Sequence, residues 1–230
     1  MRGEKENLNI SVAIDGPAAA GKSTIANLIA IKFNLMYINT GSMYRAVTLM
    51  CLREKIGFTD VNKMCELIKS LDMHFENNRI IVNNEDVEDE IRGIYVTNNV
   101  SNYAQIKEVR SLLVHMQQDM SNIYNVIMDG RDIGTVVLKS APLKFFLTAS
   151  PEARAERRYT ELSKKGLKVE YENILNDIIN RDNIDSNRTV SPLKKADDAV
   201  EIDSSSLSID EVVEVISNYI NTYMVNLCHS

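Results

Sequence analysis

Gly16-Pro17-Ala18-Ala19-Ala20-Gly21-Lys22-Ser23 is the stretch that decides the fold class of this chain. It matches the pattern G-x-x-x-x-G-K-[ST], in which backbone N–H groups of a glycine-rich loop converge on phosphate oxygens. An apolar run at residues 10–14 precedes the loop, and residues 22–33 follow it with apolar side chains at helical spacing. This strand–loop–helix context predicts a phosphate-binding loop, rather than a glycine-rich turn whose lysine faces solvent.

Two side chains of this region suit a nucleotide with a metal ion. Lys22 would bring a cation to the outer phosphates, and the Ser23 hydroxyl could bind Mg²⁺. Residues 125–129 form an apolar run that ends in Asp129, which is typical of an acid that holds Mg²⁺ through water. Many strands end in an aspartate, so Asp129 gains its meaning only from the loop that precedes it.

The rest of the chain alternates short apolar runs with helical stretches. Further strands are expected at 36–38, 125–128, 144–148 and 199–202, and helices at 42–55, 151–166, 169–185 and 208–225. Ser150-Pro151-Glu152 has the residues of a helix start, and Ser208 with Glu211 forms a capping-box pattern. The alternation predicts an α/β fold: a five-stranded parallel sheet flanked by helices, with the loops after its strands at one edge.

One segment breaks this rhythm. Between residues 72 and 92, short β-type runs are separated by the turn signals Asn77-Asn78 and Asn83-Asn84. We therefore expect a small antiparallel sheet inserted into a single domain that spans 1–230. The core of that domain would be about 10–60 and 105–225, and the insertion about 60–104.

Composition narrows the class of protein. The chain has 230 residues, of which 44% are apolar and 25% charged, and its net charge is −6. These values exclude a disordered chain and disfavour a protein that coats nucleic acid by bulk charge. The three cysteines and three histidines show no zinc spacing, the start of the chain is polar, and no run approaches the ~20 apolar residues of a membrane span. We expect a soluble, cytoplasmic monomer that binds neither nucleic acid nor membrane.

Arginines gather where the predicted strands end. Arg45 follows the second strand and Arg131 follows the third. Those of the later helical stretches are Arg154, Arg157, Arg158, Arg181 and Arg188. Guanidinium groups bind phosphate oxygens in pairs, so the set predicts a site for more than one phosphate group. The alternative is a series of surface salt bridges, which is the favoured interpretation for Arg154 or Arg157 taken alone.

These motifs carry a resemblance to a known family. Ile14-Asp15-Gly16-Pro17, Thr40-Gly41 with Tyr44-Arg45-Ala46, the segment 129–137, and Arg181-Asp182 with Asp185 and Arg188 resemble the bacterial cytidylate kinase family over about residues 10–222. The resemblance implies transfer of the γ-phosphoryl group of ATP to CMP or dCMP, with Mg²⁺. It also implies that the inserted sheet belongs to a monophosphate-binding region and that a short helical lid lies at about 151–168.

The resemblance also implies roles for single residues. The ATP phosphates would be bound by Gly16, Pro17, Ala18, Ala19, Ala20, Gly21, Lys22, Ser23 and Thr24. Thr40, Arg45 and Arg131 would hold the acceptor phosphate, while Ser101, Arg110 and Asp132 would read the cytosine. Arg181 and Asp185 would contact the ribose, and Arg188 would reach phosphates. The catalytic cations would be Lys22, Arg131, Arg157 and Arg188, and Arg158 is a second candidate on the lid.

The chain departs from the family pattern at two positions. Asn39 stands where the family usually has an acid, which removes one negative charge near the metal. Ala19 stands where glycine is common, and an alanine is tolerated there unless the position needs a positive φ.

Sequence leaves several alternatives open. Asp132 could pair with an arginine instead of a base, and Arg110 could be a solvated helix residue. The chain could be a kinase for UMP, dTMP or shikimate, or a nucleotide-dependent switch that has no acceptor. No general base is needed for phosphoryl transfer to a nucleotide, because the acceptor phosphate is already an anion above its second pKa of about 6.

Overall fold

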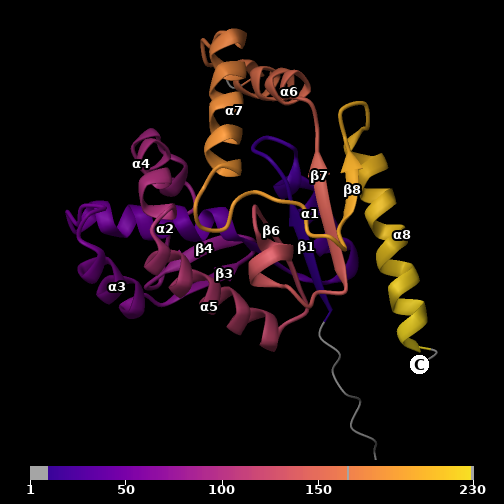
Figure 1. The fold of residues 1–230 in the computed structure, drawn as a ribbon, viewed down its shortest axis with the longest axis horizontal. Coiled ribbons are helices and arrows are strands. Elements are labelled where there is room, and N and C mark those ends of the chain that lie inside the picture. The colour runs from indigo at the N-terminus through magenta and orange to yellow at the C-terminus, as the bar shows by residue number, and fades with distance from the viewer. Residues whose placement is uncertain (1–9, 165, 229–230) are drawn as a thin grey trace, which may run out of the picture.

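The computed structural model describes residues 10–164 and 166–228, so the polar start at 1–9, expected to lack a signal peptide, lies outside the described residues. Its centre is a five-stranded parallel sheet in the order β2-β6-β1-β7-β8 (Figure 1). The strands are β1 (Ser11–Asp15), β2 (Met36–Asn39), β6 (Val126–Gly130), β7 (Leu143–Thr148) and β8 (Val200–Asp203). The parallel sheet predicted from the sequence is thus confirmed.

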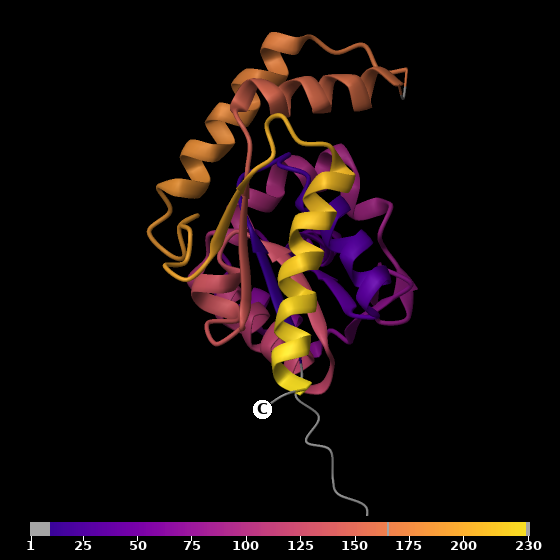
Figure 2. The ribbon, with the colours of Figure 1, turned by 90° about the vertical axis from the view of Figure 1, so that its right-hand side faces the viewer.

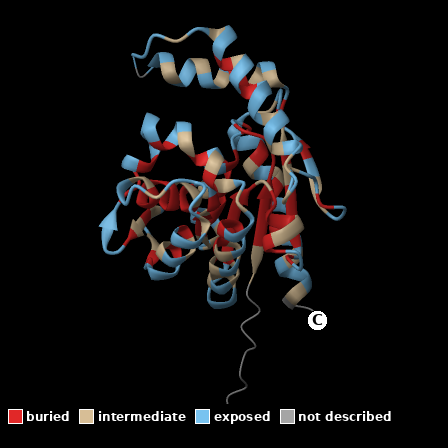
Figure 3. Cartoon of the chain, turned by 60° about the vertical axis from the view of Figure 1, so that its left-hand side comes forward, coloured by how far each residue is buried: buried red, intermediate tan, exposed pale blue. Residues whose placement is uncertain are grey.

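Helices cover both faces of this sheet. One face packs against α1 (Lys22–Phe33) and α8 (Ile209–Cys228), which lie side by side in Figure 2. The other face packs against α2 (Thr40–Arg53), α3 (Val61–Ser70), α4 (Ile94–Ala104) and α5 (Lys107–Ile123). The buried residues concentrate in and around the sheet (Figure 3), as a parallel sheet covered on both faces requires.

The inserted segment forms the expected small antiparallel sheet. It contains β3 (Met73–Glu76), β4 (Arg79–Val82) and β5 (Glu85–Asp86), followed by the 3₁₀ turn η1 (Glu90–Arg92). Asn77, Asn78, Asn83 and Asn84 all have positive φ values, which asparagine tolerates better than most residues. Ile80 and Val82 are buried in the same core as α2, so the insertion is packed onto the main domain.

Two helices project beyond the carboxyl edge of the sheet (Figure 1). They are α6 (Pro151–Lys164) and α7 (Tyr171–Ser186), which pack on each other through a cluster containing Ala155, Ile174 and Ile178. The Ser150 hydroxyl accepts a hydrogen bond from the Ala153 N–H at 3.1 Å, so the expected N-cap is present. Helix α6, which forms most of the segment expected to be a lid (151–168), packs against α7 in this structure.

The register of the sheet aligns the residues that end its strands. Asp15 of β1 lies opposite Gly130 of β6, and Asn39 of β2 lies opposite Asp129. A π-helical turn, η2 (Ile133–Val137), follows β6. Elsewhere, α7 ends at Ser186, so the expectation that Arg188 lies on that helix with Arg181 and Asp185 is wrong by two residues.

No helix of residues 10–164 and 166–228 combines the length and apolar character that a membrane crossing requires.

Candidate active site

The phosphate-binding loop connects β1 to α1, as the sequence predicts. Gly16 has a φ of +148°, and a Cβ there would lie 2.0 Å from the backbone oxygen of Leu147, so only glycine fits. The Lys22 Nζ donates to the backbone oxygen of Pro17 at 2.7 Å. Burial, followed by the nearby charge of Arg131, lowers the pKa of Lys22 well below its usual value. This ammonium is poorly solvated, so an arriving anion would stabilise it.

Ala19 stands at the exposed tip of the loop. Its φ is +60°, in the left-handed region that glycine adopts without cost. Position 19, where the family commonly has glycine, therefore does require a positive φ, and alanine is not cost-free there. The methyl group of Ala19 strains the loop by about 1–2 kcal/mol.

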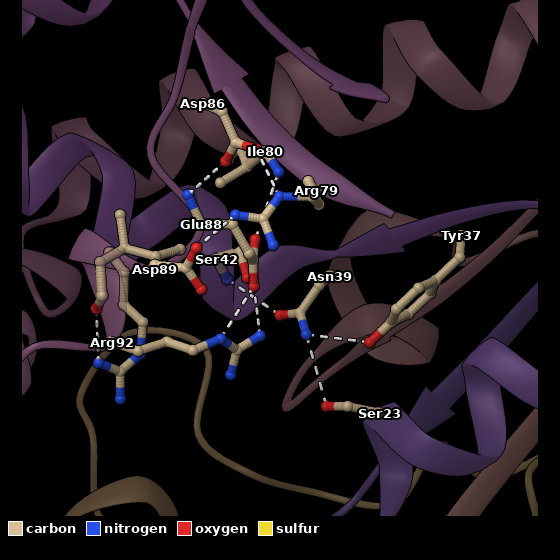
Figure 4. A network of polar contacts seen from close by, with 12 residues as sticks. Ser23, Tyr37, Asn39, Ser42, Arg79, Ile80, Asp86, Glu88, Asp89 and Arg92 are labelled. Carbon is tan, nitrogen blue, oxygen red and sulfur yellow. Dashed lines mark hydrogen bonds and ion pairs between the residues drawn. The ribbon is translucent and has the colours of Figure 1, made fainter. Parts of the chain in front are cut away.

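Ser23 and Asp129 come together in a polar network that also includes Tyr37 and Asn39. Figure 4 shows how Ser23, Tyr37 and Asn39 lie. The Ser23 hydroxyl donates to Asp129 Oδ2 at 2.9 Å, and the Tyr37 hydroxyl donates to Asp129 Oδ1 at 2.8 Å. The Asn39 amide donates to the Tyr37 oxygen at 2.9 Å, while its Oδ1 accepts from the Ser42 N–H at 2.9 Å. Burial and the charge of Asp129 raise the pKa of Tyr37, so this phenol stays a neutral donor. Asn39 thus caps α2 and orients Tyr37.

Thr40 and Arg45 project from α2, beside β6. The Thr40 hydroxyl is buried and donates to the backbone oxygen of Asp129 at 2.7 Å. One Arg45 nitrogen donates to the Ile91 oxygen at 3.1 Å and to the Thr97 hydroxyl at 2.9 Å. Burial and the positive charge of Arg181 lower the pKa of Arg45 to about 10.

Arg131 and Asp185 form an ion pair between β6 and α7, with 2.7 Å between Nε and Oδ2. Burial alone would raise the pKa of Asp185, but the charge and hydrogen bond of Arg131, with the charges of Arg188 and Arg181, hold the pKa below its usual value. Burial also lowers the pKa values of Arg181 and Arg188, to which the charge of Arg131 contributes. The structure therefore brings three predicted arginines into one electrostatic cluster: Arg131 directly after β6, Arg181 on α7 and Arg188 after α7.

Arg110 and Asp132 form the most deeply buried ion pair of the site, at 2.5 Å from Nη2 to Oδ2. The Arg110 guanidinium also lies 5.3 Å from the ring centroid of Tyr44 and donates to the backbone oxygen of Ala104. Its Nε is buried without a hydrogen-bond partner among the described residues. Arg110 is thus no solvated helix residue, and Asp132 does pair with an arginine. Ser101 lies exposed on α4, one turn before Ala104.

The three arginines of α6 have different surroundings. Arg157 donates to the hydroxyl and backbone oxygens of Ser204, and Arg158 pairs with Glu161 at 2.8 Å. Arg154 is 3% exposed and contacts Ala18 of the loop. A cavity of about 470 Å³ opens beside these contacts. Its lining includes Pro17, Thr148, Arg154, Asp182 and Ser205.

Asp15 links the loop to the segment that carries Asp132. Its two carboxylate oxygens accept from the N–H groups of Ile133 and Gly134, each at 2.7 Å. Burial raises the pKa of Asp15 to about 6, although these two hydrogen bonds oppose the shift.

Comparison with known proteins identifies the family. The family model described as cytidylate kinase matches residues 12–222. The chain belongs to the cytidylate kinase family. It is 63% identical over 214 residues to a cytidylate kinase of Clostridium acetobutylicum, covering 93% of this chain and 99% of that protein. It is 58% identical to a cytidylate kinase of Clostridium tetani, covering 95% of this chain and 96% of that protein.

A crystal structure of an uncharacterized protein from Eubacterium ventriosum shares the fold. It aligns with a TM-score of 0.52 at 14% identity and covers 93% of this chain and 99% of that one. Membership of the cytidylate kinase family confirms the resemblance inferred from the sequence and the expected enzyme class, a nucleoside monophosphate kinase.

Sequence reasoning missed two contributors to this cytidylate kinase site. The sequence predicts Arg154 as a surface salt bridge when it is taken alone, and as one of several phosphate-binding arginines when the set is taken together; neither predicts its burial against the loop. Its place in the first turn of a helix that starts at the carboxyl end of a strand could have indicated that position. Tyr37 gave no signal, because its contact with Asp129 depends on the pairing of β2 with β6.

Proposed function

We propose that the chain transfers the γ-phosphoryl group of ATP to CMP and dCMP, giving ADP with CDP or dCDP. Its membership of the cytidylate kinase family supports this reaction. The observation that supports the proposal most is that a candidate donor site and a candidate acceptor site follow two neighbouring strands of the sheet. The phosphate-binding loop follows β1, and the Arg131-Asp132 segment follows β6, whose last residue Gly130 lies opposite Asp15.

The donor side would act through charge and position. The loop at residues 16–24 would hold the phosphates of ATP through its backbone N–H groups, which every residue but Pro17 has. Lys22 would exchange the Pro17 oxygen for a phosphate oxygen. Because a loose phosphoryl transition state carries its charge on the transferred group, catalysis needs cations more than a base. Lys22, Arg131, Arg157 and Arg188 are the cations we propose for that task.

Mg²⁺ fits the residues present. Ser23 and Asp129 offer a hydroxyl and a carboxylate, the hard oxygen donors that Mg²⁺ prefers, in direct contact at 2.9 Å. Mg²⁺ commonly takes only one or two protein carboxylates together with phosphates and waters, so one aspartate is sufficient. We propose that Ser23 binds the ion directly and that Asp129 holds one of its waters. The ion would supply neutralisation of charge on the phosphates.

The acceptor side would bind CMP by exchanging ion pairs within the protein for contacts with the nucleotide. The 5′-phosphate would be bound by Arg131, Arg45 and Thr40. The Asp132 carboxylate would accept a hydrogen bond from the cytosine amino group. Arg110 and Ser101 would complete the recognition of the base. Arg181 and Asp185 would contact the ribose, so Arg131 would turn from Asp185 to the phosphate.

Closure of α6 over the nucleotides would exclude water, the competing acceptor. Arg157 is bound to Ser204 in this structure, so it would have to leave that residue to reach a phosphate. We keep 151–168 as the proposed lid. Its packing against α7 suggests that both helices move together.

The test is ADP release from ATP with CMP, dCMP, UMP, AMP, dTMP or shikimate as the acceptor, with and without Mg²⁺. We expect turnover mainly with CMP and dCMP, and only when Mg²⁺ is present. Turnover confined to another acceptor would overturn the proposed substrate. ATP binding without acceptor-dependent ADP release would favour a nucleotide-dependent switch.

A further inference from the structure

We propose that Arg154 is a positioning residue for ATP, which sets the direction of one peptide group in the phosphate-binding loop. This role rests on the proposed function and extends it to a residue buried against the loop. It starts from three hydrogen bonds that one buried guanidinium makes to three elements of the fold.

Arg154 uses each of its nitrogens on a different partner. Nε donates to the Ala149 oxygen after β7 at 2.9 Å, and Nη1 donates to the Ala18 oxygen of the loop at 2.9 Å. Nη2 donates to Asp182 Oδ2 of α7 at 2.6 Å. The fixed planar fork of a guanidinium holds these three acceptors in one geometry, which a lysine ammonium cannot do.

The bond to Ala18 decides where the next N–H points. A trans peptide is planar, and its C=O and N–H groups point to opposite sides. With the Ala18 oxygen directed to Arg154, the N–H of Ala19 must point away from Arg154. Ala19 itself is exposed and holds a φ of +60°, so the loop turns at this residue. Arg154 thus offsets part of the strain of a conformation that presents an N–H to a ligand.

Asp182 explains how a cation can be buried behind the loop. A guanidinium with 3% exposure needs a counter-charge, and Asp182 provides it from α7. The ion pair with Asp182 therefore compensates the cost of burying the Arg154 charge, while the hydrogen bond to the Ala18 oxygen orients the loop backbone. This division of roles can be tested, because each bond belongs to a different nitrogen.

Four variants separate the roles. Arg154→Met removes all three hydrogen bonds but keeps a long side chain. Arg154→Lys keeps the positive charge without the planar guanidinium. Asp182→Asn keeps a hydrogen-bond acceptor without the negative charge. Arg79→Met is the matched control for ATP binding, because Arg79 lies on β4 of the inserted sheet and pairs with Asp86 and with Asp89, which follows that sheet. For each protein, calorimetry gives the Kd of a non-hydrolysable ATP analogue and of CMP, and steady-state rates give kcat.

We expect Arg154→Met to weaken binding of the ATP analogue about 10- to 100-fold, the range for loss of one hydrogen bond to a charged group. Binding of CMP alone should stay at the wild-type value. Arg154→Lys should fall between Arg154→Met and wild type, and Asp182→Asn should affect ATP much less than either. The Ala19 amide resonance of the ATP-bound protein should shift in both Arg154 variants and remain unchanged in Arg79→Met.

Three results would overturn the proposal. They are unchanged affinity for the ATP analogue in Arg154→Lys, a parallel loss of ATP and CMP affinity, and a loss in Asp182→Asn as large as in Arg154→Lys. If Arg154→Met fails to fold, the lysine and asparagine variants still decide the outcome. Absence of turnover with CMP in the wild-type protein would contradict the proposed function instead, while the ATP affinities would still test Arg154.

Discussion

The phosphate-binding loop lies at the same edge of the sheet as a second group of residues, here called the acceptor cluster: Arg110, Arg131, Asp132 and Asp185, which we propose to bind CMP. The two regions are stabilised in different ways. The loop is held from behind: Arg154 fixes the Ala18 oxygen, and the exposed tip at Ala19 is left for a ligand. The acceptor cluster is held from within, because Arg131 pairs with Asp185 and Arg110 pairs with Asp132. The proposed ATP site therefore leaves the exposed tip of the loop free for a ligand, whereas Arg110 and Arg131 of the proposed CMP site are paired with carboxylates of the protein.

This difference has an energetic consequence. A ligand of the loop meets backbone N–H groups and the desolvated Lys22, and no ion pair between side chains must break. A phosphate that binds the acceptor cluster must displace a carboxylate from an arginine, as at Arg131 and Asp185. Its binding free energy then includes only the difference between the new ion pair and the one that is broken. Exchange of this kind favours a nucleotide that compensates Asp132 and Asp185 as well, through its base and its ribose. The acceptor cluster should thus determine which nucleotide is selected, while both regions should stabilise the charge of the transferred phosphoryl group.

The largest effect should come from Lys22→Met. We expect kcat to fall about 10³-fold, because a preorganised charge aimed at the transferred group is lost. The free energy of unfolding should not fall, since Lys22 is a buried cation whose one hydrogen bond within residues 10–164 and 166–228 goes to the Pro17 oxygen. Steady-state kinetics and urea unfolding measure both quantities. Lys32→Met on the same helix is the exposed control, and a large loss of stability in Lys22→Met would contradict the preformed loop.

The next effect concerns pH and Asp15, which joins the two regions. The folded pKa of Asp15 is raised to about 6 from 3.8, so the folded state holds the proton more tightly than the unfolded state. Stability should therefore fall as pH rises from about 4 to about 6, by about 3 kcal/mol, and level off above that range. Urea unfolding of wild type and Asp15→Asn at pH 4 to 7 isolates this contribution. Parallel stability curves for the two proteins would show that Asp15 does not titrate in this window.

A smaller, selective effect is expected for Asp132→Asn. The kcat/KM for CMP should fall about 10- to 100-fold, as for loss of a hydrogen bond to a charged group, and that for UMP should fall less. The preference for CMP would then shrink. Asp198→Asn is the control, because Asp198 is an exposed acid that pairs with Lys144 and not with Arg110 or Arg131. Retention of the full preference for CMP in Asp132→Asn would remove Asp132 from base recognition.

The smallest effect belongs to the tip of the loop. Ala19→Gly should raise the free energy of unfolding by about 0.5–1 kcal/mol, because relief of the positive φ exceeds the entropy cost of glycine. Ala20→Gly is the matched control, since Ala20 is buried and has no positive φ, and it should lower stability. Thermal unfolding measures both changes. Destabilisation by Ala19→Gly would show that the loop is not strained at this residue.

Local pattern was sufficient to predict the framework and the residues of the loop. Helix α1 has the predicted bounds, and the capping box at Ser208 forms with Glu211. The contacts of Tyr37, Arg154 and Arg157 could not be predicted in the same way. Each joins segments far apart in the sequence, and it exists only because of the strand order β2-β6-β1-β7-β8. The left-handed turn at Ala19 also escaped prediction, because alanine rarely adopts it.

A crystal structure with CMP and a non-hydrolysable ATP analogue tests the contrast between the two regions most directly. We predict that the loop backbone keeps its conformation, with Arg154 still on the Ala18 oxygen, while Arg131 leaves Asp185 for the CMP phosphate. A loop rebuilt around the ATP analogue, beside an unchanged Arg131–Asp185 pair, would contradict the account.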